Sequence, residues 1–182
     1  MIRFFFRFIG IVILAFLTML AHLFFLNFLS FPFNHVLVFF VALTWFAATA
    51  SNEVAWIFAI ALGYFLELFS PLPFGIELIS IITSLFIIRW MLWNVFTSRS
   101  LPIILMTHAI SLLTYFILLG VYLFFRDFFD HDLVPFFLFQ FLIGVIWSFF
   151  LTSCLLALWY RLAAPLVRRL NPSYVRQERF LV

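Results

Sequence analysis

Long apolar runs separated by short polar or turn-forming segments constrain this chain more than any other feature. A helix needs about 20 mainly apolar residues to cross the hydrocarbon core of a bilayer. The runs are continuously apolar instead of alternating, which favours helices over a β-barrel. Charged residues make up only 9% of the chain, against roughly 25% in soluble domains. The sequence therefore predicts an all-α, polytopic membrane protein.

Turn-forming residues divide the chain into six predicted transmembrane helices. Pro32 ends the first apolar run, and Asn34 is placed to cap the next helix. The predicted spans are about 8–29, 35–50, 54–69, 76–96, 102–125 and 133–160. Spans two and three, at about 24 Å each, either cross the bilayer or form a re-entrant pair. We expect residues 1–160 to form a single transmembrane domain and 161–182 a basic cytoplasmic tail.

Arginine placement predicts the orientation, because positive residues near span ends stay in the cytoplasm. All ten basic residues are arginines. Six spans put nine of them on one side: Arg3, Arg7, Arg89, Arg99, Arg161, Arg168, Arg169, Arg176 and Arg179. Arg126 alone falls on the other side, in an acidic connection that runs to Asp132. Both termini are therefore expected in the cytoplasm, and the first apolar run is too long for a cleaved signal peptide.

The composition also limits the classes of function. The spans leave no room for a soluble catalytic domain, and no nucleophile–base pair, phosphate loop or metal-ligand spacing is present. We therefore expect no enzymatic activity, no cofactor and no metal. The small net charge of +3 makes nucleic acid an unexpected partner. The lipid bilayer is the expected environment, and the tail arginines either attract anionic lipid or serve only as a topology signal.

A row of small residues marks the third span. Ala59, Gly63 and Glu67 recur at four-residue spacing, and such rows allow two helix backbones to approach closely in lipid. Glu67 ends this row. An acidic residue on an apolar helix usually faces the bundle or an aqueous cavity, although one near a helix end can also lie exposed at the interface.

The turn after this span is predicted to lie in an outward-facing groove that Glu67 and Glu77 flank. Pro71, Pro73 and Gly75 favour a rigid turn. Glu77 follows at the start of the fourth span, where capping of a helix N-terminus is an alternative role for its carboxylate. Ser80 follows Glu77 at helical spacing and extends a polar stripe along the same face of the fourth span. The candidate partner or ligand groove comprises Glu67, Pro71, Pro73, Gly75, Glu77 and Ser80.

Polar residues also follow the fifth span. Thr107, Ser111 and Thr114 form a row beside His108. Hydrogen bonding between helices is the preferred interpretation of Thr107 and Ser111. A proton relay through His108 is the alternative.

Two segments resemble the MreD family of bacterial rod-shape-determining membrane proteins. They are GYFLELFSPLPFGIELIS, residues 63–80, and FTSRSLPIILMTHAISLLTYFILL, residues 96–119, with Arg89 between them. The resemblance implies a non-enzymatic scaffold subunit of the cell-elongation machinery in the bacterial inner membrane. It also implies an MreC-like bitopic partner and the cell-wall synthases that make peptidoglycan.

Two other functions compete with the scaffold. The chain is also similar in size and span number to the substrate-binding membrane subunit of energy-coupling-factor transporters, in which case the groove between Glu67 and Glu77 would hold a small molecule. A protein that handles lipid or polyprenyl phosphate is the third possibility, but an acidic groove has the wrong sign for phosphate.

Overall fold

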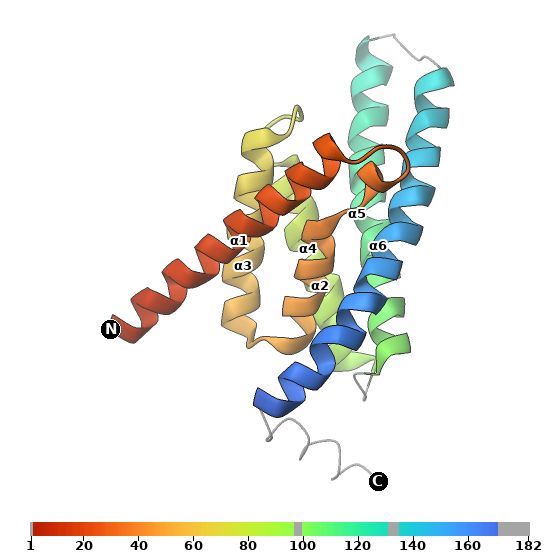
Figure 1. Cartoon of the computed structure of the whole chain (residues 1–182). Coiled ribbons are helices and arrows are strands. Elements are labelled where there is room, and N and C mark those ends of the chain that lie inside the picture. Colours follow the sequence, from red (N-terminus) through yellow and green to blue (C-terminus); the bar gives the residue numbers. More distant parts are fainter. Residues whose placement is uncertain (1, 97–99, 131–134, 171–182) are drawn as a thin grey trace.

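The computed structural model describes residues 2–96, 100–130 and 135–170. All regular secondary structure in this part of the chain is helical (Figure 1). Six α-helices and one 3-10 turn follow one another, with no strand among the described residues. The elements are α1 (Ile2–Phe28), η1 (Phe33–His35), α2 (Val38–Thr49), α3 (Asn52–Phe69), α4 (Ile76–Asn94), α5 (Leu101–Asp130) and α6 (Pro135–Leu170). The predicted all-α fold is confirmed.

Five of these helices, α1, α3, α4, α5 and α6, are long and apolar enough to cross a membrane. The protein is therefore a multi-pass membrane protein. The remaining α-helix, α2, has only 12 residues. Its length of about 18 Å is well short of the roughly 30 Å thickness of the hydrocarbon core. It begins at Val38 instead of near residue 35, because Phe33–His35 form the 3-10 turn. Asn34 lies inside this turn, and Leu37 is the N-cap of α2.

The short helix α2 lies at the centre of the bundle. It packs against each of the other five α-helices, and Phe39, Phe40 and Leu43 are almost completely buried. The irregular backbone before it is satisfied by the protein, since the Leu37 amide donates to the Thr152 hydroxyl of α6 at 3.1 Å. Non-helical backbone at membrane depth needs such internal partners.

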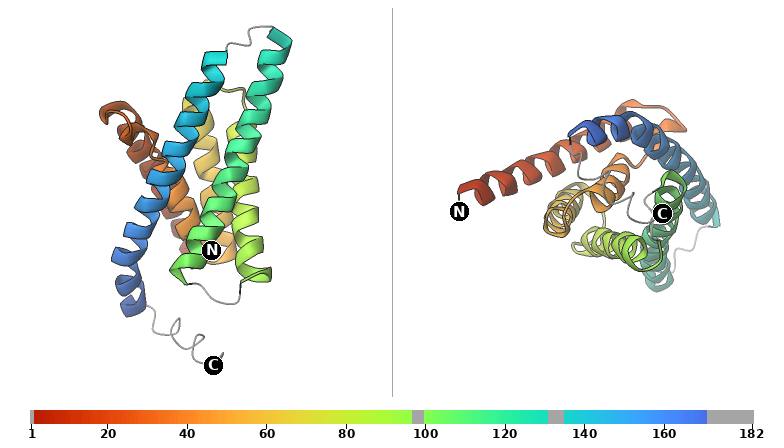
Figure 2. Two further views of the ribbon diagram at one scale, coloured as in Figure 1. Left: turned by 90° about the vertical axis from the view of Figure 1, so that its right-hand side faces the viewer. Right: turned by 90° about the horizontal axis from the view of Figure 1, so that it is seen from below.

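The remaining helices surround α2 (Figure 2). The N-terminal part of α1 runs obliquely away from the bundle, whereas α3 and α4 form a tight antiparallel hairpin. The C-terminal end of α5 and the N-terminal end of α6 project beyond the α3–α4 turn in both side views. The α2–α3 turn lies at the opposite end of the bundle (Figure 1).

Helices α5 and α6 end later than the sequence-based expectation. Helix α5 continues to Asp130 because residues 126–130 contain no proline or glycine to end it. Helix α6 continues past residue 160 to Leu170, so the expected tail begins as helix. Several predicted topology residues lie outside the described part of the chain: Arg99, His131, Asp132, Arg176 and Arg179.

Candidate functional site

Glu67 connects α3 to the N-terminus of α4. Its Oε1 atom accepts hydrogen bonds from the backbone amides of Gly75 at 2.9 Å and Leu78 at 2.8 Å. Gly75 is the N-cap of α4 and has no side chain with which to satisfy the orphan amides of the first turn. Glu67 therefore caps α4 from a neighbouring helix, with its negative charge at the positive end of the helix dipole.

The close approach of α3 to α4 depends on Gly63, one helical turn before Glu67. A Cβ atom on Gly63 would lie 2.7 Å from Leu78 Cδ1 and 3.2 Å from Leu78 Cα, closer than van der Waals contact allows. Ala59, one turn further back, is fully buried. Gly63 and Glu67 thus meet the same residue of α4: the glycine makes room for Leu78, and the carboxylate binds its amide.

Glu77 lies on the other side of this helix start. Its Oε2 accepts a 2.8 Å hydrogen bond from the Tyr115 hydroxyl of α5, and its Oε1 accepts a longer one, 3.4 Å, from the Ser70 hydroxyl. The Ser70 oxygen in turn accepts from the Leu72 amide at 3.2 Å. Glu77 therefore links α4 to α5 and to the turn. Neither sequence-based prediction for Glu77, as a groove residue or as a helix cap, included this role.

Both carboxylates face inward. Glu67 is 6% exposed and Glu77 8% exposed, and the second oxygen of Glu67 is buried with no hydrogen-bond partner among the described residues. Ser80 is also buried. The outer surface of the turn is formed instead by Pro71, Pro73 and Phe74, of which Phe74 is 70% exposed.

The turn itself is possible because of Gly75. Its φ of +108° lies in the left-handed region, which residues with a Cβ rarely adopt. This conformation reverses the chain within the few residues between Ser70 and Ile76. The structure thus brings together Glu67, Gly75, Glu77 and the turn prolines at one end of the α3–α4 hairpin.

A second polar cluster lies among α2, α4 and α5. Thr44 Oγ1 and His108 Nδ1 are 2.8 Å apart, and Thr44 also donates to the Phe40 carbonyl. The Ser84 hydroxyl donates to the Ser111 carbonyl at 3.4 Å. Thr107 is fully buried but donates within its own helix, to the Ile103 carbonyl. Hydrogen bonding between helices thus involves His108 and the Ser111 backbone, whereas the Thr107 hydroxyl stays within α5.

Arg89 braces the opposite end of the hairpin. Its Nη2 atom donates to the carbonyls of Ala50 and Ser51, each at 2.9 Å. These carbonyls follow the last residue of α2, where a cation is favoured by the helix dipole. Arg89 is only 7% exposed, and these two carbonyl oxygens accept hydrogen bonds from its buried guanidinium group.

Sequence reasoning missed Tyr115, Thr44 and the structural role of Arg89. Tyr115 follows Ser111 and His108 at helical spacing, so its place on the buried face could have been read from the same pattern. Arg89 is the one charged residue between Glu77 and Arg99, which suggests a specific partner. Thr44 carries no comparable signal.

No group of three or more His, Cys, Asp or Glu residues that could hold a metal occurs in the described part of the chain. The chain was also compared with protein-family models, with curated proteins and with solved structures, and no match was found in any of the three. The fold and the site therefore define a class: a multi-pass α-helical membrane protein with an internally braced α3–α4 hairpin.

Proposed function

We propose that this protein is a non-enzymatic scaffold subunit of the bacterial cell-elongation machinery, located in the inner membrane with both termini in the cytoplasm. Its partners would be an MreC-like bitopic protein and the synthases of the lateral cell wall. The observation that carries this proposal is the folding of residues 63–80. The segment that resembles the MreD family forms one braced unit, in which Glu67 caps α4 and Gly63 allows α3 to approach it.

The outside of this unit suits a partner helix better than a polar ligand. Tyr64, Leu68, Phe69, Phe74 and Ile79 are all between 48% and 70% exposed. A rigid apolar surface of this kind can bind the transmembrane and juxtamembrane segment of another protein through close packing. Because bracing fixes its shape in advance, little ordering entropy would be lost on binding.

The alternative is a small-molecule-binding subunit of an energy-coupling-factor-type transporter. That function would use Glu67 and Glu77 as ligand contacts. Both side chains are instead buried and hydrogen-bonded to other parts of the chain, which favours the scaffold.

Co-purification of the full-length protein from native membranes tests the proposal. An MreC-like protein should be recovered with the wild type, and Phe74→Ala combined with Leu68→Ala should reduce its recovery without reducing insertion. Phe150→Ala is the matched control, because Phe150 is 59% exposed on α6, away from the hairpin. Saturable stabilisation by one small ligand, with no elongation-machinery protein recovered, would instead establish the carrier.

A further inference from the structure

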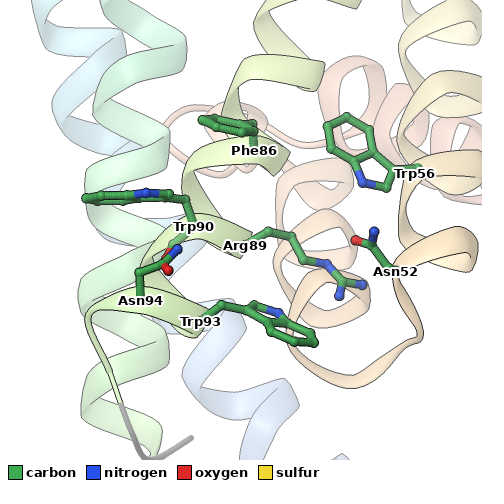
Figure 3. Close-up of a pocket in the computed structure, with 7 residues that line it drawn as sticks. All are labelled: Asn52, Trp56, Phe86, Arg89, Trp90, Trp93 and Asn94. Carbon is green, nitrogen blue, oxygen red and sulfur yellow. The ribbon is translucent and has the colours of Figure 1, made fainter.

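The described part of the bundle offers two different environments. A pocket of about 340 Å³ between α3 and α4 is lined mainly by the rings of Trp56, Phe86, Trp90 and Trp93 (Figure 3). Acyl chains solvate such walls well, so this lining specifies no polar ligand. The second polar cluster, among α2, α4 and α5, is different, because buried hydroxyl and imidazole groups need hydrogen-bond partners.

The ring of His108 on α5 is fully buried and contacts two residues of α2. The Phe40 ring lies edge-on to it, with the ring centroids 5.4 Å apart, and Thr44 Oγ1 lies 2.8 Å from His108 Nδ1. The other ring nitrogen, Nε2, is buried with no hydrogen-bond partner among the described residues. Burial of a polar atom without a hydrogen bond is unfavourable, so we expect this nitrogen to have a partner other than a side chain.

The contact with Thr44 shows which ring nitrogen of His108 carries hydrogen. The Thr44 hydroxyl has one hydrogen, which it donates to the Phe40 carbonyl at 2.9 Å. Towards His108 the Thr44 oxygen can therefore only accept, so Nδ1 is the nitrogen that donates. In the neutral ring, Nε2 then carries a lone pair and no hydrogen. The partner that Nε2 needs is therefore a hydrogen-bond donor.

The neighbouring hydroxyl groups direct their hydrogens elsewhere. Ser111 donates to the His108 carbonyl at 3.2 Å, and Ser84 donates to the Ser111 carbonyl at 3.4 Å. Thr107 donates to the Ile103 carbonyl. Each hydroxyl oxygen still has lone pairs that can accept a hydrogen bond. A small molecule with two hydrogens to donate would therefore match both Nε2 and a hydroxyl oxygen of the cluster.

We propose that a water molecule binds in this cluster and donates a hydrogen bond to His108 Nε2. Buried waters typically satisfy polar atoms that the protein itself leaves unpaired, and they are costly to remove. The second hydrogen of the water would bond a hydroxyl oxygen of the same cluster, so that the water joins the helices nearly as well as a direct hydrogen bond would. The site does not depend on the scaffold function, because it lies within the bundle and away from the outer surface of the α3–α4 turn.

Nitrogen NMR of the full-length protein in phosphatidylcholine liposomes, with isotope-labelled histidine, tests the proposal. The signals of His108 are those that disappear in His108→Phe. We expect Nδ1 to be protonated, Nε2 to be unprotonated, and magnetisation from water protons to reach Nε2. A hydrogen on Nε2 in the wild type, or no transfer from water to that nitrogen, would overturn the proposal.

Two changes at Thr44 test the assignment of the acceptor without altering the histidine. Thr44→Ser keeps the hydroxyl and should preserve the His108 signals. Thr44→Val keeps the shape of the side chain but leaves Nδ1 without its acceptor, so hydrogen should move from Nδ1 to Nε2 in part of the population. His35, half-buried in η1, is the internal reference and should give the same signals in both variants. Unchanged His108 signals in Thr44→Val would show that Thr44 does not set the tautomer and would also overturn the proposal.

Discussion

The carboxylate of Glu67 on α3 accepts a 2.8 Å hydrogen bond from the backbone amide of Leu78 on α4. An interhelical side chain thus does the work that an N-cap residue usually does within its own helix. Gly75, the residue at the N-cap, supplies the left-handed backbone but no side-chain acceptor. Gly75 therefore provides the turn and Glu67 provides the cap, although the two residues lie eight positions apart in the sequence.

Removal of this cap should destabilise the hairpin. Glu67→Leu leaves the amides of Gly75 and Leu78 without their acceptor and should lower the free energy of unfolding by about 1–3 kcal/mol. Glu67→Gln keeps an acceptor oxygen without the charge and should cost less. Unfolding of the purified protein in detergent, followed by circular dichroism, measures both changes. Glu53→Gln, at an exposed position, is the control, and an equal loss there would contradict the assignment.

A side chain at Gly63 should destabilise the α3–α4 hairpin. Gly63→Ala places a Cβ atom against Leu78 and should cost about 1–3 kcal/mol, since overpacking forces the helices apart. Gly10 is the matched control, because a Cβ atom there meets nothing within 4 Å. Gly10→Ala should be neutral or slightly stabilising through helix propensity. Melting temperatures of the two variants, measured side by side, decide the matter, and the same response in both would exclude a special role for Gly63.

The hydrogen bond between Tyr115 and Glu77 should contribute to packing of α5 on α4. Tyr115→Phe removes only the hydroxyl and leaves Glu77 Oε2 without this donor, at an expected cost of about 1–3 kcal/mol. Tyr64→Phe is the control, since Tyr64 is 48% exposed and should lose little. A chemical unfolding curve for each variant gives the comparison. If the two curves coincide, the Tyr115–Glu77 bond does not stabilise the bundle.

Sidedness can be tested at the two ends of α3. In a Cys154→Ser background, Pro73→Cys should react with a membrane-impermeant maleimide in intact cells, because the arginine distribution places this turn outside. Ser51→Cys should react only after the membrane is permeabilised. Both positions are exposed, so a lack of reaction would reflect the membrane and not burial in the protein. The reverse pattern would invert the proposed topology.

The helical, membrane-spanning character of the chain follows from its sequence alone. Continuous apolar runs without alternation favour helices in lipid, because a helix satisfies every backbone polar group within its own segment. Turn-forming residues placed the α3–α4 turn correctly, because Pro71, Pro73 and Gly75 restrict the backbone locally. The end of α5 was less accurately placed, because charge in residues 126–130 suggested a loop while nothing there prevents a helix.

Only the tertiary structure decided what the polar side chains contact. Glu67 and Glu77 lie close enough in sequence to suggest one shared groove, yet one binds backbone amides of α4 and the other binds Tyr115 of α5. The central position of α2 and the contact of Thr44 with His108 likewise depend on how the helices pack. Periodicity gives the face on which a residue lies, but it does not tell which helix covers that face. In lipid, where apolar side chains are equally well solvated by neighbours and by acyl chains, that choice is made by close packing and by hydrogen bonds between distant parts of the chain.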